Sequence, residues 1–559
     1  MKQAKTASQA DRIRQPESGT FASLDPMALK AAIAGRDEIA LVDPREEGIF
    51  GKAHLLLAVN VPLSRLELRI ERLVPRKATR VVLIDDGDGL SERAAANLAD
   101  LGYSRIEILA GGNGAWLAAG LELFSGMSVP TKAFGEWIAE ACGTPLITAE
   151  ELHRKLAAGE DVVILDSRPA NEYVNMTIPG AINVPVSELV YRFGELPVTP
   201  DALVVVNCAG RTRSLIGTQT LIDAGIANRV TALKGGTMAW QMAGFQLEHG
   251  ATRHAPEPWG RNLQEALRRS RAVAERNQVQ IIGQAQLAVF QAESERRSLY
   301  IIDVRPPDEF LAGHRSDSSH AWGVQLVQSL DRFVATRNAR LVLVDHYQVR
   351  ALTTASWLAQ AGLREVFVLS DPFAGCELVS GGSPAQIPGS EQGSLPRLTA
   401  LELNGLLQQR EATIVDFSDS LSFKRRHIPG AYFAIRSRLA ESLGKLPAGA
   451  SFVATGTDPA LTALAAADLS RISGRPVALL DGGNEAWEEA GLERAAGWEN
   501  LAAEPDDVFR MPFLWGHFED RAEFEAAAKA YFEWELQLPE QLRRAGEIEF
   551  SRNGPLNPR

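Results

Sequence analysis

The sequence predicts an α/β protein of four tandem modules, each a small, mainly parallel sheet flanked by helices, followed by a C-terminal extension. A chain of 559 residues is long enough for several domains, and its 45% hydrophobic and 23% charged content is that of an ordinary globular protein. One order of apolar strands and helix-like runs also occurs four times along it. The predicted parts are module 1 (residues 20–127), module 2 (145–251), module 3 (275–382), module 4 (396–500) and the C-terminal extension (501–559).

Each module opens with a short helix signal and an apolar strand that ends in aspartate. These aspartates are Asp43, Asp166, Asp303 and Asp416. Their spacing along the chain suits one small α/β domain each. A turn and a short strand follow each aspartate, and the copy of this turn in module 3, AGHRSDSSHAWGV, is degenerate.

A second buried strand then leads into a helix in every module, and a last strand leads into a turn. The second strands read RVVLID, LVVVNC, RLVLVD and SFVATG. The last turn is rich in glycine and ends in Trp116, Trp240 and Trp487 in modules 1, 2 and 4, whereas Cys376 takes that place in module 3. Alternating strands and helices indicate a parallel sheet, which places ligands where loops leave the carboxyl ends of its strands.

Cys208 lies at such a strand end, in the stretch LVVVNCAGRTRS. Its thiol faces the backbone N–H groups that open the next helix, with Arg211 and Arg213 close by, and both effects favour a reactive thiolate. Gly210 allows close backbone approach, so the same turn can cradle an oxyanion such as thiosulfate or phosphate. The alternative interpretation is a buried structural cysteine.

The motifs of module 2, taken together, resemble those of the rhodanese superfamily. They are the Asp-x-Arg start at Asp166 and Arg168, the turn IPGAINVP, the strand into CAGRTRS, and the closing KGGTMAW. The resemblance extends over residues 20–500 and is strongest in module 2. It implies that Cys208 is a nucleophile that accepts a sulfane sulfur as a persulfide and passes it to a thiophilic acceptor.

The loop after Cys208 is expected to bind the substrate through backbone donors and positive charge. Its residues are Ala209, Gly210, Arg211, Thr212 and Arg213. Arg213 is expected to hold the substrate anion, and Arg211 to point to solvent and steer the substrate. The resulting spacing is Cys-x4-Arg. In the family that the sequence resembles, this length goes with sulfur transfer, whereas phosphatase relatives carry one more residue.

The equivalent turn lacks cysteine in the other three modules. Asp85 takes the place of Cys208 in module 1, Asp345 in module 3, and Gly456 in module 4, or Thr455 if the register shifts by one. An aspartate cannot hold sulfane sulfur and repels an anion from the turn. We therefore expect one active site per chain and three inactive modules.

Asp166, Arg168 and Trp240 are possible supporting residues. The acidic residue recurs in modules without cysteine, which favours a structural Asp166–Arg168 pair, and Glu172 is interpreted in the same way. Core packing is the favoured interpretation of Trp240. Cys142 is either a resolving thiol for Cys208 or inert, and Cys376 is a packing substitution.

Composition limits the partners and the compartment. A net charge of −12 argues against a general nucleic-acid or acidic-membrane binder, and no apolar run reaches the length of a membrane span. Three cysteines cannot all pair, and residues 1–20 lack a signal peptide's apolar core, so we expect the cytoplasm. No histidine has metal-ligand spacing, and we expect neither a metal nor another cofactor.

The favoured function is a sulfurtransferase that moves sulfur from thiosulfate or a low-molecular-weight persulfide to cyanide or a thiol. The alternatives are a non-catalytic docking scaffold made of all four modules, and a phosphatase. Phe and Trp residues in the C-terminal extension predict packing either onto a module or onto a second subunit, the latter giving a homodimer.

Overall fold

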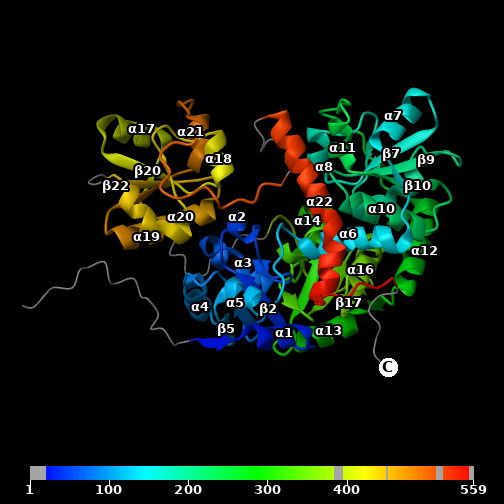
Figure 1. The fold of residues 1–559 in the computed structure, drawn as a ribbon, viewed down its shortest axis with the longest axis horizontal. Helices are drawn as coiled ribbons and strands as arrows, with labels where there is room; N and C mark the ends of the chain where they lie inside the picture. Colours follow the sequence, from blue (N-terminus) through cyan, green and yellow to red (C-terminus); the bar gives the residue numbers. More distant parts are fainter. Residues whose placement is uncertain (1–20, 383–394, 448–450, 512–519, 553–559) are drawn as a thin grey trace, which may run out of the picture.

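Each module is built on a parallel sheet flanked by helices, which confirms the predicted fold class (Figure 1). The computed structural model describes residues 21–382, 395–447, 451–511 and 520–552. Modules 2, 3 and 4 share one strand order, β6-β10-β9-β7-β8 in module 2, β11-β17-β16-β12-β14 in module 3 and β19-β23-β22-β20-β21 in module 4. In the described part of the chain, no helix is long and apolar enough to span a membrane.

Modules 1 and 2 form the first half of the chain, with helix α6 between them. Module 1 contains β1 (Ala22–Leu24), α1 (Pro26–Ala34), β2 (Ile39–Asp43), α2 (Glu47–Phe50), β3 (Val59–Asn60), α3 (Leu66–Leu73), β4 (Arg80–Leu83), α4 (Leu90–Asp100), β5 (Ile106–Leu109) and α5 (Gly112–Ala118). After α6 (Val129–Cys142), module 2 contains β6 (Leu146–Ile147), α7 (Ala149–Ala157), β7 (Val162–Asp166), α8 (Ala170–Asn175), β8 (Ile182–Asn183), α9 (Leu189–Arg192), β9 (Leu203–Asn207), α10 (Thr212–Asp223), β10 (Arg229–Leu233) and α11 (Gly236–Met242).

Modules 3 and 4 follow helix α12 (Gly260–Arg276). Module 3 contains β11 (Gln280–Ile282), α13 (Gln284–Ala292), β12 (Leu299–Asp303), α14 (Pro307–Ala312), β13 (His314–Arg315), β14 (Ser319–His320), α15 (Gly323–Gln328), β15 (Thr336–Arg337), β16 (Arg340–Val344), α16 (Val349–Gln360), β17 (Val366–Leu369) and β18 (Leu378–Val379). Module 4 contains β19 (Arg397–Leu398), α17 (Ala400–Gln409), β20 (Ala412–Asp416), α18 (Ser420–Arg425), β21 (Tyr432–Phe433), α19 (Leu439–Ser442), β22 (Ser451–Thr455), α20 (Pro459–Ser473), β23 (Val477–Leu480) and α21 (Gly483–Glu489).

The central strands are apolar because both faces of each sheet are covered. All five residues of β2 are buried, and so are the last four of β9. The strand register aligns the Cys208 turn of module 2 with the equivalent turns of modules 3 and 4. Asn207 pairs with Asp166 in module 2, Val344 with Asp303 in module 3, and Thr455 with Asp416 in module 4. Gly456, rather than Thr455, is therefore the first residue after its strand, as Cys208 is.

Modules 1 and 3 share a sheet, which differs from the prediction of one sheet per module. Strand β15 of module 3 pairs antiparallel with β2, with Thr336 opposite Ala40 and Arg337 opposite Ile39. It covers the half of the β2 edge that β3 leaves open. A strand of two residues carries no periodic pattern, so the sequence gives no sign of this pairing.

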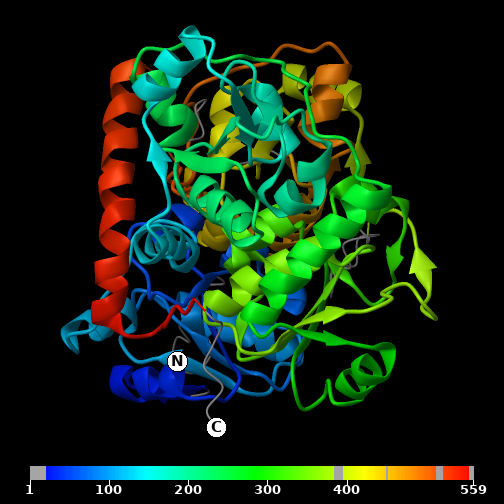
Figure 2. The ribbon, with the colours of Figure 1, turned by 90° about the vertical axis from the view of Figure 1, so that its right-hand side faces the viewer.

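The C-terminal extension contributes α22 (Arg521–Ala545), which packs onto modules of the same chain. Its Phe524, Ala528 and Tyr531 join the core of module 1, and Leu538 and Leu542 pack beside α6. Figure 2 shows α22 standing along one side of the molecule. Of the two placements left open by the sequence, this structure shows packing onto a module.

Candidate active site

Cys208 is the first residue after β9, at the carboxyl edge of the sheet of module 2. The side chain is buried, and its Sγ lies 3.5 Å from Ser214 Oγ, which in turn donates a hydrogen bond to the carbonyl oxygen of Arg211. The residues between them connect β9 to α10, as the apolar run and the following helix pattern predict.

The carbonyl side of this loop is tied to the start of α11. The N–H groups of Thr237 and Met238 donate to the carbonyls of Cys208 (2.9 Å) and Ala209 (3.1 Å). Gly236 makes this approach possible, because its φ is +56° and a Cβ there would lie 2.2 Å from the Cys208 carbonyl oxygen. The glycine turn of the sequence motif therefore positions the cysteine loop.

Arg213 is buried and held by a carboxylate. It donates to both oxygens of Glu172 on α8, at 2.7 and 2.9 Å. Burial disfavours the charged form of Glu172, but the Arg213 guanidinium outweighs this and lowers the pKa of Glu172 below its usual value. The bidentate pair fixes the guanidinium beside the thiol and gives Glu172 a definite positioning role.

The structure contradicts the expected orientation of Arg211. We expected this side chain to point to solvent, but it is buried and donates to both oxygens of Glu136, at 2.6 and 2.7 Å. The reason is that α6, which links modules 1 and 2, packs against α10 and brings this carboxylate with it. Arg211 anchors α6 to the cysteine loop instead of steering substrate.

Three groups near Cys208 come from outside module 2 and were missed by the sequence reasoning: Lys132 on α6, and Tyr531 and Glu535 on α22. Burial lowers the pKa of Lys132, against the opposing influence of Glu535 and the Cys208 sulfur. Tyr531 Oη and Thr212 Oγ1 both donate to Glu535 Oε1, at 2.8 and 3.1 Å. Burial raises the pKa of Glu535 above its usual value. Together, α6 and α22 close over the loop.

The Asp166–Arg168 pair supports the strand end. Arg168 donates to both oxygens of Asp166, and Thr177 Oγ1 donates to Asp166 Oδ2 at 2.7 Å. Corresponding pairs occur at Asp43–Arg45 and Asp303–Arg305, in modules without cysteine. This recurrence supports the structural interpretation of the pair.

Trp240 lies in the core of module 2 together with Leu152, Ile164 and Tyr173. Its indole N–H donates to the carbonyl of Gln246 at 2.9 Å, and Trp116 and Trp487 make the same bond to the sixth residue after them. This geometry supports core packing over a place in the pocket wall.

Cys142 lies beside Asp223 and Arg552, at the carboxyl end of α10, whereas Cys208 precedes the amino end of the same helix. Twelve residues of helix separate the two ends by about 18 Å. This separation favours the inert interpretation of Cys142 over the resolving-thiol alternative. Cys376 is half-buried in the turn after β17, 3.9 Å from the carbonyl oxygen of Pro372.

In modules 1 and 3 a carboxylate fills the place of the thiol. Asp85 accepts the N–H groups of Gly87 and Ser91, at 2.9 and 2.8 Å. Asp345 accepts the N–H of Arg350 at 2.9 Å and pairs with its guanidinium at 2.8 Å. These donors correspond in sequence position to Gly210, Ser214 and Arg213 of module 2. The loop is thus a cradle for negative charge.

In module 4 the cradle is closed. A Cβ added to Gly456 would lie 2.6 Å from Thr462 Oγ1, so the helix that follows leaves no room for a side chain. Leu461 stands where Arg213 stands in module 2, and Asp458 caps α20. Module 4 therefore offers neither a nucleophile nor a cation at this turn.

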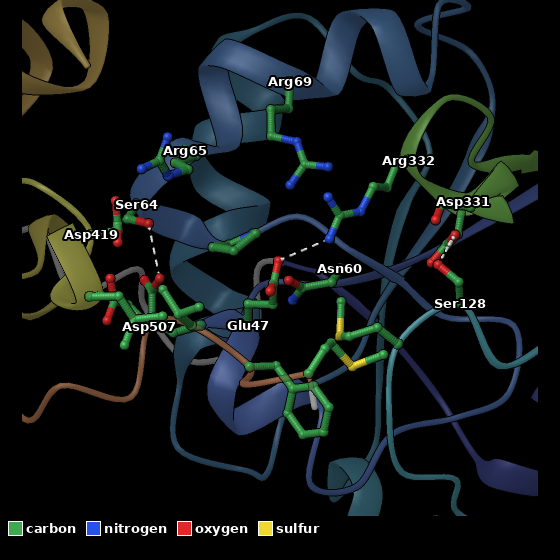
Figure 3. Close-up of a pocket in the computed structure, with 18 of the residues that line it drawn as sticks. Glu47, Asn60, Ser64, Arg65, Arg69, Ser128, Asp331, Arg332, Asp419 and Asp507 are labelled. Carbon is green, nitrogen blue, oxygen red and sulfur yellow. Dashed lines mark hydrogen bonds and ion pairs between the residues drawn. The ribbon is translucent and has the colours of Figure 1, made fainter. Parts of the chain in front are cut away.

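A cavity of about 840 Å³ opens beside the active site, between the four modules. Module 2 and α6 contribute Lys132, Pro169 and Glu172 to its lining, and most of the remaining lining comes from modules 1, 3 and 4. Figure 3 shows part of this cavity, with side chains from modules 1, 3 and 4 around one space.

The chain belongs to the rhodanese-like family. A family model described as Rhodanese-like domain matches residues 25–119, 148–243, 286–375 and 399–490. These four matches cover most of the chain and include both the cysteine-bearing module and the three that lack cysteine. The fold is therefore that of rhodanese-like sulfurtransferases.

Among solved structures, a thiosulfate sulfurtransferase from Pseudomonas aeruginosa is 43% identical, with a TM-score of 0.89 over 95% of this chain and 99% of that chain. A sulfurtransferase of Allochromatium vinosum is 34% identical over 101 residues, 18% of this chain and 92% of that protein. An HTH-type transcriptional regulator of Mycobacterium tuberculosis is 37% identical over 115 residues, 20% of this chain. The match spans about half the length of that regulator.

Proposed function

We propose that the protein is a sulfurtransferase that carries sulfane sulfur on Cys208. The observation that carries the proposal is the cradle itself: Cys208 is the one thiol among the four equivalent turns, and Arg213, held by Glu172, lies on the same loop. The likeness to a thiosulfate sulfurtransferase over nearly the whole chain supports the same function. The donor is thiosulfate or a low-molecular-weight persulfide, and the acceptor is cyanide or a thiol.

The reaction has two steps. The Cys208 thiolate attacks the outer sulfur of thiosulfate, forming a Cys208–S bond and breaking the sulfur–sulfur bond of the donor, so that sulfite leaves with the electron pair. The acceptor then attacks the outer sulfur of the persulfide, and the Cys208 thiolate is released. The loop N–H groups and Arg213 stabilise the negative charge that stays on the outer sulfur between the two steps.

The test is mass spectrometry of the intact chain after incubation with thiosulfate. We expect wild type to gain one sulfur atom that cyanide removes, and Cys208→Ser to gain none while keeping its fold. Absence of the added sulfur from well-folded wild type, with both thiosulfate and glutathione persulfide, would exclude the proposal. Turnover of aryl phosphates at Cys208 would point to the phosphatase alternative instead.

We also place this reaction in the cytoplasm, since Cys142, Cys208 and Cys376 are all free thiols and a sulfur carrier of this kind needs its thiol reduced.

A further inference from the structure

The cavity beside the active site has a concentration of arginines on one side. Helix α3 of module 1 and the segment before it contribute Arg65, Arg69 and Arg72, and module 3 contributes Arg332. In Figure 3 the guanidinium ends of Arg69 and Arg332 converge on the space above Glu47. The inactive modules 1 and 3 therefore build a positively charged wall.

Arg69 has no anionic partner. Among the residues that the structure describes, no carboxylate lies within ion-pair distance of its guanidinium, whereas Arg65 pairs with Asp458 at 2.9 Å. Of the carboxylates in the described ranges, Glu47 is the one within ion-pair distance of Arg332, at 3.6 Å. Burial, and next the charge of Arg332, lower the pKa of Arg69 below its usual value. Unpaired like charges in a recess are unfavourable unless an anion joins them.

The same cavity approaches the Cys208 loop through two of its lining residues. Its lining includes Lys132, whose charge acts on the Cys208 sulfur, and Glu172, which holds Arg213. Its volume of about 840 Å³ is within the range of pockets that enclose ligands much larger than thiosulfate. A molecule held by the arginines of modules 1 and 3 would thus lie in a cavity whose wall also contains Lys132 and Glu172, the two residues that connect it to the Cys208 loop.

We propose that Arg69, Arg72 and Arg332 bind the carboxylates of a low-molecular-weight thiol that accepts the sulfur from Cys208. This proposal rests on the proposed sulfurtransferase function. Guanidinium groups bind carboxylates through paired, charge-assisted hydrogen bonds, and two or more arginines suit a thiol with more than one carboxylate. The acceptor thiolate attacks the outer sulfur of the Cys208 persulfide, a new sulfur–sulfur bond forms on the acceptor, and the Cys208 thiolate leaves.

The kinetic test loads Cys208 with sulfur from thiosulfate and compares two acceptors. Mercaptosuccinate carries two carboxylates, and 2-mercaptoethanol carries none. In Arg69→Gln we expect the ratio of kcat/KM for mercaptosuccinate to that for 2-mercaptoethanol to fall roughly 10- to 100-fold, mainly through KM, the loss expected for hydrogen bonds to a charged group. Arg332→Gln should change the ratio in the same direction.

The matched control is Arg80→Gln, in the same module but outside the cavity, where Arg80 pairs with Glu107. The ratio should be unchanged in this variant. Because Arg69 has no partner to lose, Arg69→Gln should melt no lower than wild type. An unchanged ratio in both Arg69→Gln and Arg332→Gln would overturn the proposal.

An equilibrium measurement separates this proposal from the proposed function. Succinate is an unreactive dicarboxylate, and calorimetry with the Cys208→Ser chain requires no sulfur transfer. We expect saturable binding of one succinate per chain, weakened at least tenfold by adding Arg69→Gln. If wild type forms no persulfide but succinate still binds through Arg69, the proposed function fails while the anion site stands; if succinate does not bind, the anion site is wrong.

Discussion

Modules 2 and 3 present the same loop with opposite contents. Arg213 lies five residues after Cys208, and Arg350 lies five residues after Asp345. Each arginine is held by a glutamate in the same place, Glu172 or Glu309. In module 3 the Asp345 carboxylate occupies the cradle and takes both the N–H and the guanidinium of Arg350. The loop has one place for negative charge. Module 3 fills this place with its own carboxylate, whereas module 2 has the Cys208 thiol there, the proposed carrier of sulfur.

The largest effect should come from making module 2 like module 3. In Cys208→Asp we expect the new carboxylate to pair with Arg213 and sulfur transfer from thiosulfate to cyanide to fall at least ~1,000-fold, as when a covalent nucleophile is removed. The thermal midpoint should stay close to that of wild type, since Asp345 shows that the loop accepts a carboxylate. Substantial remaining transfer would mean that Cys208 is not the carrier.

A smaller loss of activity is expected when the cation of the Cys208 loop, Arg213, is removed. Arg213→Gln removes the charge beside the persulfide but leaves the loop N–H groups, so kcat/KM with thiosulfate should fall about 100-fold, the usual effect of removing one preorganised donor. Steady-state kinetics measure this. Arg192→Gln, which breaks an ion pair with Glu188 elsewhere in module 2, is the matched control and should leave kcat/KM within twofold.

A substitution at the equivalent turn of module 3 should lower the stability of the protein and leave the rate of sulfur transfer unchanged. Asp345→Asn removes the negative charge from a fully buried pair, and although Glu309 still holds Arg350, we expect a loss of about 2 kcal/mol in unfolding free energy. Denaturant midpoints and the thiosulfate assay together check this. Asp481→Asn, at an exposed pair with Arg397, should cost less than about 0.5 kcal/mol. If Asp345→Asn slowed sulfur transfer without lowering the free energy of unfolding, the contrast drawn between modules 2 and 3 would be wrong.

Glu46 is a buried carboxyl group that, among the described residues, forms no ion pair, whereas Asp345 pairs with Arg350. At the junction of modules 1 and 4 it accepts hydrogen bonds from Ser64 and Ser437, and burial raises its pKa to about 7. Above pH 4.5 the folded chain therefore keeps a proton on Glu46 that the unfolded chain releases. Because of this difference, the contribution of Glu46 to the free energy of unfolding falls as the pH rises from 4.5 to about 7.

Glu46→Gln mimics the protonated form. We expect it to be more stable than wild type at pH 8, by on the order of 1 kcal/mol, with no difference at pH 4. Thermal unfolding of both proteins across this pH range measures the difference. A variant that is less stable than wild type at pH 8 would show that the charged carboxylate is favoured at this junction.

The sequence was sufficient for what lies within one module. The apolar run Leu203–Val206, the helix after it and the glycine turn before Trp240 place Cys208 at a strand end, and the structure has it there. Setting the four turns side by side also identified Asp85, Asp345 and Gly456 as the replacements, and the strand register agrees with this for modules 2, 3 and 4.

Contacts between modules could not be predicted in the same way. Helical periodicity tells which face of α6 or α22 is buried, but not which surface covers it. Glu136 therefore gave no sign that it would pair with Arg211, and Tyr531 and Glu535 lie more than three hundred residues from Thr212. The positively charged wall of the cavity could not be predicted for the same reason, because Arg69 and Arg332 come together only when modules 1 and 3 assemble.

The pairing of β15 with β2 also constrains how the chain is made. Modules form in the order in which the ribosome delivers them, so β2 must wait with part of its edge open until module 3 has been synthesised. An open strand edge is a site for wrong pairing, including with the neighbouring chain on the same messenger RNA. Helix α22 arrives later still, and until then the Cys208 loop lacks one of its two covers. The Cys208 loop is therefore enclosed on both sides only after α22 has been synthesised.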